Sequence, residues 1–272
     1  MLFGNKKCPQ CGSSYDVVES TCPNCHTPDR NFDSLRVSKD YVWLPVYKQV
    51  TLFVFGFGLL TLLSMLAKSI FGLFMDPEST GFALTVNYIR YVLTAAAMAV
   101  LLIHNYHNFK PTMKRWYSYL IGIVVGVATI LVTLGYNTMI NLIHPMGTNA
   151  NQTLANNMIH DFPVLSLFLL VIIGPTVEEM TYRVGLFTVL ARVHKAVAYI
   201  VSIVVFAFIH FDISATGDAL VNEFLSLPVY VFTGGLLCFA YDTFGLPASL
   251  TAHVLNNFIS TLPIIFAVIG GK

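Results

Sequence analysis

The chain has few charged residues and almost no net charge. Charged residues make up 11% of its 272 positions, and 15 Lys and Arg are balanced by 14 Asp and Glu. Soluble domains carry about 25% charged residues, and nucleic-acid-binding domains normally show a clear basic excess. Because 56% of the residues are hydrophobic, the composition excludes an ordinary soluble protein, makes nucleic acid an unlikely partner and indicates a polytopic membrane domain.

The sequence also lacks internal repeats, low-complexity tracts and a secretory signal. No apolar stretch with a small-residue cleavage site follows the first lysines. Residues 1–45 are polar and contain four of the five cysteines, with five basic and five acidic residues, whereas apolar runs dominate afterwards. We expect a small domain at residues 1–32, a linker at 33–45 and a transmembrane domain at 46–272.

Four cysteines in the small domain have the spacing of metal ligands. Two CxxC pairs, Cys8 with Cys11 and Cys22 with Cys25, are separated by ten residues. Two such pairs typically close one tetrahedral zinc site, whose binding folds a segment too small to build its own core. The motif predicts a zinc ribbon with structural zinc, serving as a structural or protein-docking module. A disulfide pair, or haem attachment at the CxxCH formed with His26, is the alternative.

Seven apolar segments follow the linker and are long enough to approach or cross a bilayer, which takes about 20 residues per helix. Gly174-Pro175 interrupts the fourth and could divide it into two short elements. The fold class we predict is all-α, a polytopic membrane protein with about seven or eight transmembrane helices plus the zinc ribbon. The segments are residues 46–74, 83–103, 116–143, 162–190, 196–211, 220–241 and 246–269.

The distribution of basic residues predicts the orientation. With the N-terminus in the cytosol, 11 of the 15 Lys and Arg lie on the cytosolic side. The loops at 76–81 and 144–161 contain none, as expected of external loops. We therefore expect a multi-pass protein of the cell membrane with a cytosolic N-terminus.

Polar side chains interrupt three of the apolar segments. Counted at 1.5 Å per residue, Glu178 and His210 lie about 21 Å from the cytosolic boundary, His253 about 10 Å and Asn257 about 16 Å. Ionisable residues at such depths are expensive and usually face a protein interior or a water-filled cavity. Overlapping depths on separate helices indicate a single site.

Two interpretations of these residues remain open. Glu179 and Arg183 are four residues apart and could pair on one helix face as structural contacts. Glu178 points elsewhere, and a carboxylate with a neutral imidazole can activate water for hydrolysis. His253 and Asn257, four apart on one face, could donate hydrogen bonds to an oxyanion.

Three motifs occur in order on these segments. EExxxR begins at Glu178, FxxxH joins Phe206 to His210, and HxxxN joins His253 to Asn257. Together they resemble the CPBP family of intramembrane proteases. This family includes the CAAX prenyl endopeptidases of the Ras-converting type and bacterial bacteriocin-processing or immunity proteins.

The resemblance implies a protease-like core at residues 162–269 and peptide-bond hydrolysis in a cavity open to the cytosol. The catalytic residues it implies are Glu178, His210, His253 and Asn257, and the supporting residues are Glu179, Arg183 and Phe206. Glu178 and His210 would activate water, and His253 and Asn257 would stabilise the oxyanion.

The expected function is that of an intramembrane endopeptidase acting on a peptide or protein reached from the cytosolic side. The family is often described as metalloproteases, but the HExxH pattern of soluble zinc proteases is missing. Water activation without a metal and a catalytic zinc both remain open. The alternatives are a non-proteolytic regulator or immunity protein that binds a partner through the same cavity, and a transporter, which the lack of repeats disfavours.

Overall fold

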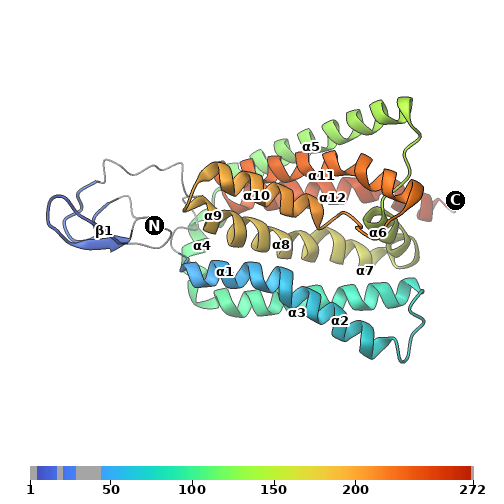
Figure 1. Cartoon of the computed structure of the whole chain (residues 1–272), viewed down its shortest axis with the longest axis horizontal. Helices are drawn as coiled ribbons and strands as arrows, with labels where there is room; N and C mark the ends of the chain where they lie inside the picture. Colours follow the sequence, from blue (N-terminus) through green and yellow to red (C-terminus); the bar gives the residue numbers. More distant parts are fainter. Residues whose placement is uncertain (1–4, 17–20, 29–43, 271–272) are drawn as a thin grey trace.

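The computed structural model describes residues 5–16, 21–28 and 44–270. The predicted linker lies outside these residues apart from its last two. Figure 1 shows a small β-hairpin and a bundle of long helices, which confirms the predicted fold class.

The N-terminal hairpin is built around the cysteines. Strands β1 (Asn5–Lys7) and β2 (Ser14–Asp16) pair antiparallel. The buried core consists of Cys8, Tyr15 and Cys22. Because so little apolar surface is buried, a segment of this size requires a metal or a disulfide to stay folded.

The membrane part contains six helices that are long and apolar enough to cross a bilayer, counted over the described residues: Val46–Phe71, Thr80–Asn105, Trp116–Ile143, Pro163–Ala191, Gly217–Phe244 and Leu246–Ile269. The remaining predicted segment, 196–211, contains a shorter apolar helix, Lys195–Phe208. The count is therefore six long spans and one short helix.

The membrane part comprises the following elements in chain order. The first half contains α1 (Val46–Val54), η1 (Phe55–Leu59), α2 (Leu60–Phe71), α3 (Thr80–Leu102), η2 (Ile103–Asn105), α4 (Tyr106–Met113) and α5 (Trp116–Ile143). The second half contains α6 (Ala150–Asp161), α7 (Pro163–Leu167), η3 (Phe168–Ile173), α8 (Gly174–Glu179), η4 (Met180–Phe187), α9 (Thr188–Ala191), α10 (Lys195–Phe208), α11 (Gly217–Phe244) and α12 (Leu246–Ile269).

The predicted break at Gly174-Pro175 does not divide the fourth span. The run from Pro163 to Ala191 is one helix of 29 residues. Its segments η3 and η4, on either side of α8, are π-helical. Proline removes one backbone donor and its ring crowds the preceding turn, and a widened turn accommodates both effects. The helix therefore continues through the proline.

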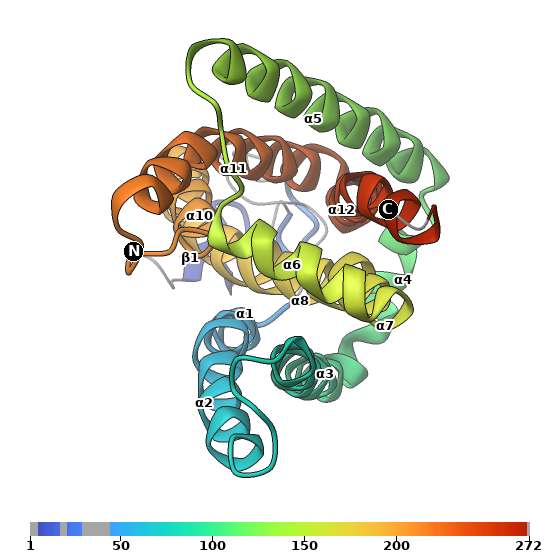
Figure 2. The same ribbon diagram turned by 90° about the vertical axis from the view of Figure 1, so that its right-hand side faces the viewer.

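Figure 2 looks along the bundle and shows α8 near its centre, with α1, α2 and α3 on one side and α5, α11 and α12 on the other. We call the end where α1 begins the proximal end, and the opposite end, where α6 lies, the distal end. Basic residues that the sequence assigns to one side of the membrane belong to proximal segments: Lys48, Lys110, Lys114, Arg115, Arg192 and Lys195.

Two glycines permit close approach of helix backbones in the bundle. A Cβ atom at Gly185 would lie 2.9 Å from the backbone nitrogen of Phe53 in α1. One at Gly122 in α5 would lie 2.6 Å from the carbonyl oxygen of Ala248 in α12. Small residues let membrane helices approach in this way, and the contacts fix the helices that carry the polar residues.

Candidate active site

Glu178 and Glu179 are the last two residues of α8 and have different surroundings. Successive helix residues point about 100° apart. The Glu179 side chain is completely buried, whereas that of Glu178 keeps 15% of its exposure. Glu178 is therefore the carboxylate that a ligand can reach.

Glu179 belongs to a buried cluster of charges. Its Oε1 lies 3.3 Å from Nη1 of Arg183, which is also fully buried, so the two form the ion pair that their spacing predicts. The Arg183 guanidinium lies 4.4 Å from the ring centroid of Phe206 and donates to the carbonyl of Gly234. Removal of either charge would leave the other uncompensated in a non-polar interior.

His253 in α12 lies between the two carboxylates. Its Nδ1 is 2.9 Å from Oε1 of Glu179, and its Nε2 is 3.7 Å from Oε2 of Glu178. A carboxylate only accepts, so Nδ1 carries the proton in the bond with Glu179. The other ring nitrogen is thereby aimed at Glu178.

His210 follows the C-terminal end of α10, and its ring lies between two aromatic rings. The centroid of Tyr230 is 4.5 Å away with nearly parallel planes, and that of Phe206 is 4.9 Å away. Nδ1 lies 2.8 Å from the carbonyl oxygen of Phe206 and so donates to it. In the neutral ring this leaves Nε2 as a proton acceptor.

Asn257 in α12 lies one helical turn beyond His253. Its Nδ2 donates to the carbonyl of Leu170 at 3.0 Å, and its Oδ1 accepts from Asn256 at 3.4 Å. Leu170 lies in the π-helical segment before α8. Asn257 thus ties α12 to this segment, and an amide nitrogen retains a second hydrogen to donate.

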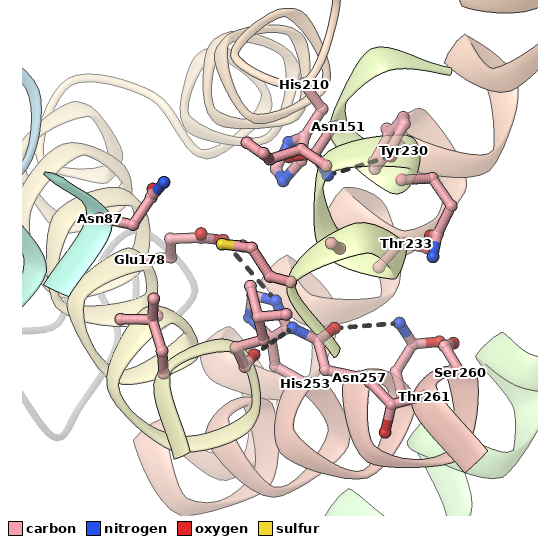
Figure 3. Close-up of a pocket in the computed structure, with 18 of the residues that line it drawn as sticks. Asn87, Asn151, Glu178, His210, Tyr230, Thr233, His253, Asn257, Ser260 and Thr261 are labelled. Carbon is pink, nitrogen blue, oxygen red and sulfur yellow. Dashed lines mark hydrogen bonds and ion pairs between the residues drawn. The ribbon is translucent and has the colours of Figure 1, made fainter. Parts of the chain in front are cut away.

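Five of the predicted site residues surround one cavity of about 230 Å³. Glu178, His210, His253 and Asn257 line it, together with Phe206. Figure 3 shows Glu178 and His210 approaching the same space from different helices, with His253 and Asn257 along one side. Polar side chains from α8, α12 and the end of α10 therefore share one hollow, as the sequence predicts.

Sequence reasoning missed three aromatic and basic residues of this cavity. The Tyr91 hydroxyl donates to Oε1 of Glu178 at 3.3 Å, and Tyr230 stacks on His210. Arg90 also lines the cavity. Arg90 and Tyr91 could have been found from the sequence, because a basic residue directly followed by a tyrosine is unusual within an apolar segment such as 83–103.

Glu223 holds the segment after His210 in place. This residue of α11 is 2% exposed. Its Oε1 accepts from the backbone nitrogen of Ala150, the first residue of α6, at 2.8 Å, and its Oε2 accepts from that of Asp212 at 3.2 Å. Asp212 itself accepts from Ser214. One buried carboxylate thus joins the His210 loop to α6, which lines the cavity.

The ligand atoms around the cavity are less tightly gathered than those of a preformed metal centre. Within the part of the chain that the structure describes, one group of at least three His, Cys, Asp or Glu residues has all its ligand atoms within 4.8 Å of one another, and it consists of the four N-terminal cysteines. Glu178, His210 and His253 do not form such a group among the described residues.

The N-terminal cysteines do fit a metal ion. The Sγ atoms of Cys8 and Cys25 are 3.5 Å apart and those of Cys11 and Cys22 are 3.6 Å apart. Tetrahedral zinc–thiolate bonds place sulfur atoms about 3.8 Å apart, whereas a disulfide bond is about 2.05 Å long. Hydrogen bonds from the side chain and backbone of Ser13 lower the pKa of Cys11 to about 5, which favours the thiolate that binds metal.

We propose that the ion is zinc and expect about one zinc per chain. Cys8→Ser combined with Cys22→Ser removes one thiolate from each pair and should abolish binding. Cys238→Ser is the matched control, because this buried cysteine lies in α11. Metal content is measured by mass spectrometry of the purified full chain. Zinc retained by the double variant would refute the assignment.

Comparison with known proteins concerns a segment that supplies part of the cavity lining. Residues 160–259 match the model of a family described as type II CAAX prenyl endopeptidase, Rce1-like. No curated protein and no solved structure shows a significant match to the chain. The matched segment includes the residues of all three motifs. The resemblance predicted from those motifs, to the intramembrane proteases of the CAAX prenyl endopeptidase type, is therefore confirmed.

Proposed function

We propose that the chain is an intramembrane endopeptidase in which Glu178 and His210 activate water. The observation that carries the proposal is the shared cavity, where a reachable carboxylate and two imidazoles converge from three helical segments. The family match supports protease activity in general.

The carboxylate of Glu178 has the position of a general base. Its Oε2 is buried and has no hydrogen-bond partner among the described residues, while the Tyr91 hydroxyl donates to Oε1. A water bound between Oε2 and Nε2 of His210 would lose a proton to the carboxylate as its oxygen attacks the peptide carbonyl. When the C–N bond breaks, this proton passes to the leaving amine.

The negative charge that develops on the carbonyl oxygen requires donors in the same cavity. In the protonated ring, Nε2 of His253 donates toward the cavity, and Glu179 fixes the ring through Nδ1. The remaining N–H of Asn257 is the second donor. Donors already held in position stabilise an oxyanion without reorganisation, so Glu179 and Arg183 act as positioning residues.

The cavity indicates where a substrate enters. Three exposed residues that line it, Asn151, Leu154 and Ser260, lie in the distal half of the molecule. A second cavity of about 250 Å³ shares Thr133 and Tyr230 with it and is lined by the loop before α6. We therefore place substrate access at the distal end.

This proposal replaces the cytosolic access that the family resemblance implies. The proximal end carries the basic residues, and the positive-inside rule assigns such an end to the cytosol. The resulting arrangement is a multi-pass protein of the cell membrane with a cytosolic N-terminus and with access from the opposite side or from the bilayer.

The test is cleavage by the full chain in liposomes. Wild-type protein is incubated with a mixture of apolar peptides, and new termini are identified by mass spectrometry. We expect cleavage by the wild type and by His144→Ala, an exposed histidine at the end of α5. His210→Ala should lose it because the second proton acceptor is gone. Equal cleavage by His210→Ala would reject the mechanism.

A non-proteolytic regulator remains the second candidate, since a cavity can bind a partner without cutting it. In cells, Glu178→Ala separates the two functions. A protease loses its cellular effect, whereas a regulator that acts by binding keeps it.

A further inference from the structure

Helix α3 presents a polar face to the cavity. Asn87, Arg90, Tyr91 and Thr94 have the three- and four-residue spacing of one helix side, and the first three line the cavity. In a helix within a bilayer, such a stripe faces protein or water. Arg90 lies about 15 Å along the helix from its first residue, Thr80, and is therefore deep within the span.

Arg90 has no anionic partner within the described part of the chain. Its Nε is buried without an acceptor, and its guanidinium lies 5.0 Å from the ring centroid of Tyr91. Glu178 is the acidic residue of the cavity, but no ion pair within 4.0 Å joins it to Arg90. Tyr91 stands between the two charges, with its ring beside the guanidinium and its hydroxyl on Glu178.

A guanidinium at this depth is costly unless an anion or several acceptors compensate it. Its planar group of N–H donors matches a carboxylate, which it can bind with two parallel hydrogen bonds. We propose that Arg90 is a specificity-determining residue that binds a carboxylate of the polypeptide substrate. This proposal rests on the proposed protease function.

The size of the cavity limits where that carboxylate can lie. A space of about 230 Å³ holds only a few residues, and Arg90 and Glu178 face it together. The carboxylate therefore lies within a few residues of the bond that is cut. Its source is either the C-terminus of the substrate or an Asp or Glu side chain, and both present the same group to Arg90.

Four matched sets of synthetic apolar peptides separate the two sources. All four are built on the same randomised positions. The first set ends in a free acid and the second in an amide. The third and fourth also end in an amide and carry one internal Asp or, at the same position, Asn. Cleavage by the full chain in liposomes is quantified for wild type, Arg90→Gln and Arg90→Lys. Thermal unfolding of each variant identifies loss of fold.

We expect the wild type to cut the acid or the Asp set about tenfold faster than its uncharged counterpart, as one charge-assisted hydrogen bond allows. Arg90→Gln should remove this preference, because cleavage of the carboxylate-bearing set falls more than cleavage of its uncharged counterpart. Arg90→Lys should keep part of it. An equal decrease for all four sets would instead assign Arg90 to the reaction centre, and an unchanged preference would remove it from recognition; either overturns the proposal.

Failure of the protease function gives a different result. If the wild type cuts none of the sets, binding of the same peptides to the full chain is measured by calorimetry. Discrimination within either pair, acid against amide or Asp against Asn, that disappears in Arg90→Gln still supports the subsite. Equal binding within both pairs by the wild type rejects it.

Discussion

Glu178→Gln is expected to reduce peptide-bond cleavage by about 10²–10⁴-fold, the usual contribution of a general base. Glutamine preserves the size of the side chain and can still accept the hydrogen bond from the Tyr91 hydroxyl, but its amide cannot take a proton from water. The unfolding temperature should stay close to that of the wild type because the side chain is partly exposed. Cleavage rate and unfolding temperature are measured on the same liposome or detergent preparations.

Glu78→Gln is the matched control, since this exposed residue lies between α2 and α3. The control should retain full activity. Glu178→Asp should retain a small part, because a shorter carboxylate can still accept a proton from a displaced position. Full cleavage activity in Glu178→Gln would contradict the assignment of Glu178 as the general base.

Arg183→Ala is expected to destabilise the protein by about 3–5 kcal/mol, the usual effect of breaking a buried ion pair. The substitution leaves the carboxylate of Glu179 buried opposite His253 and removes the guanidinium from the Phe206 ring. The free energy of unfolding in detergent micelles, measured against the wild type, gives the loss.

The double variant Glu179→Leu with Arg183→Leu separates the effect of the ion pair on protein stability from the role of Glu179 in positioning the His253 ring. Apolar residues of similar volume can replace a buried pair at little cost, so the double variant should be more stable than Arg183→Ala. It should nevertheless remain inactive, because Nδ1 of His253 has lost the acceptor that orients its ring. Wild-type cleavage by the double variant would show that Glu179 does not position His253.

The local sequence was sufficient to predict the elements and the convergence of the polar residues. Long apolar runs set the helices, and the two CxxC pairs predicted the thiol cluster. Depth along each helix placed Glu178 and His210 at about the same level and His253 at a shallower one, and the structure brings all three to one cavity. These features depend on spacing within short segments.

Features that depend on contacts between distant segments were not predictable. The sequence gives no sign that Tyr91 reaches Glu178, since the residues are 87 positions apart. It also allowed a break at Pro175, because the π-helical turns beside it depend on packing against other helices. The two hydrogen bonds of the Glu223 carboxylate could not be predicted either, because they depend on where α6 and the loop after His210 lie in the fold.

The two hydrogen bonds that the Glu223 carboxylate accepts from backbone nitrogens have a consequence for access to the cavity. One oxygen holds the start of α6 and the other holds the loop after His210. If α6 swings outward alone, a buried acceptor loses its donor, which is unfavourable. We therefore expect the helix and the loop to shift together, so that a displacement of α6 would also displace the His210 imidazole.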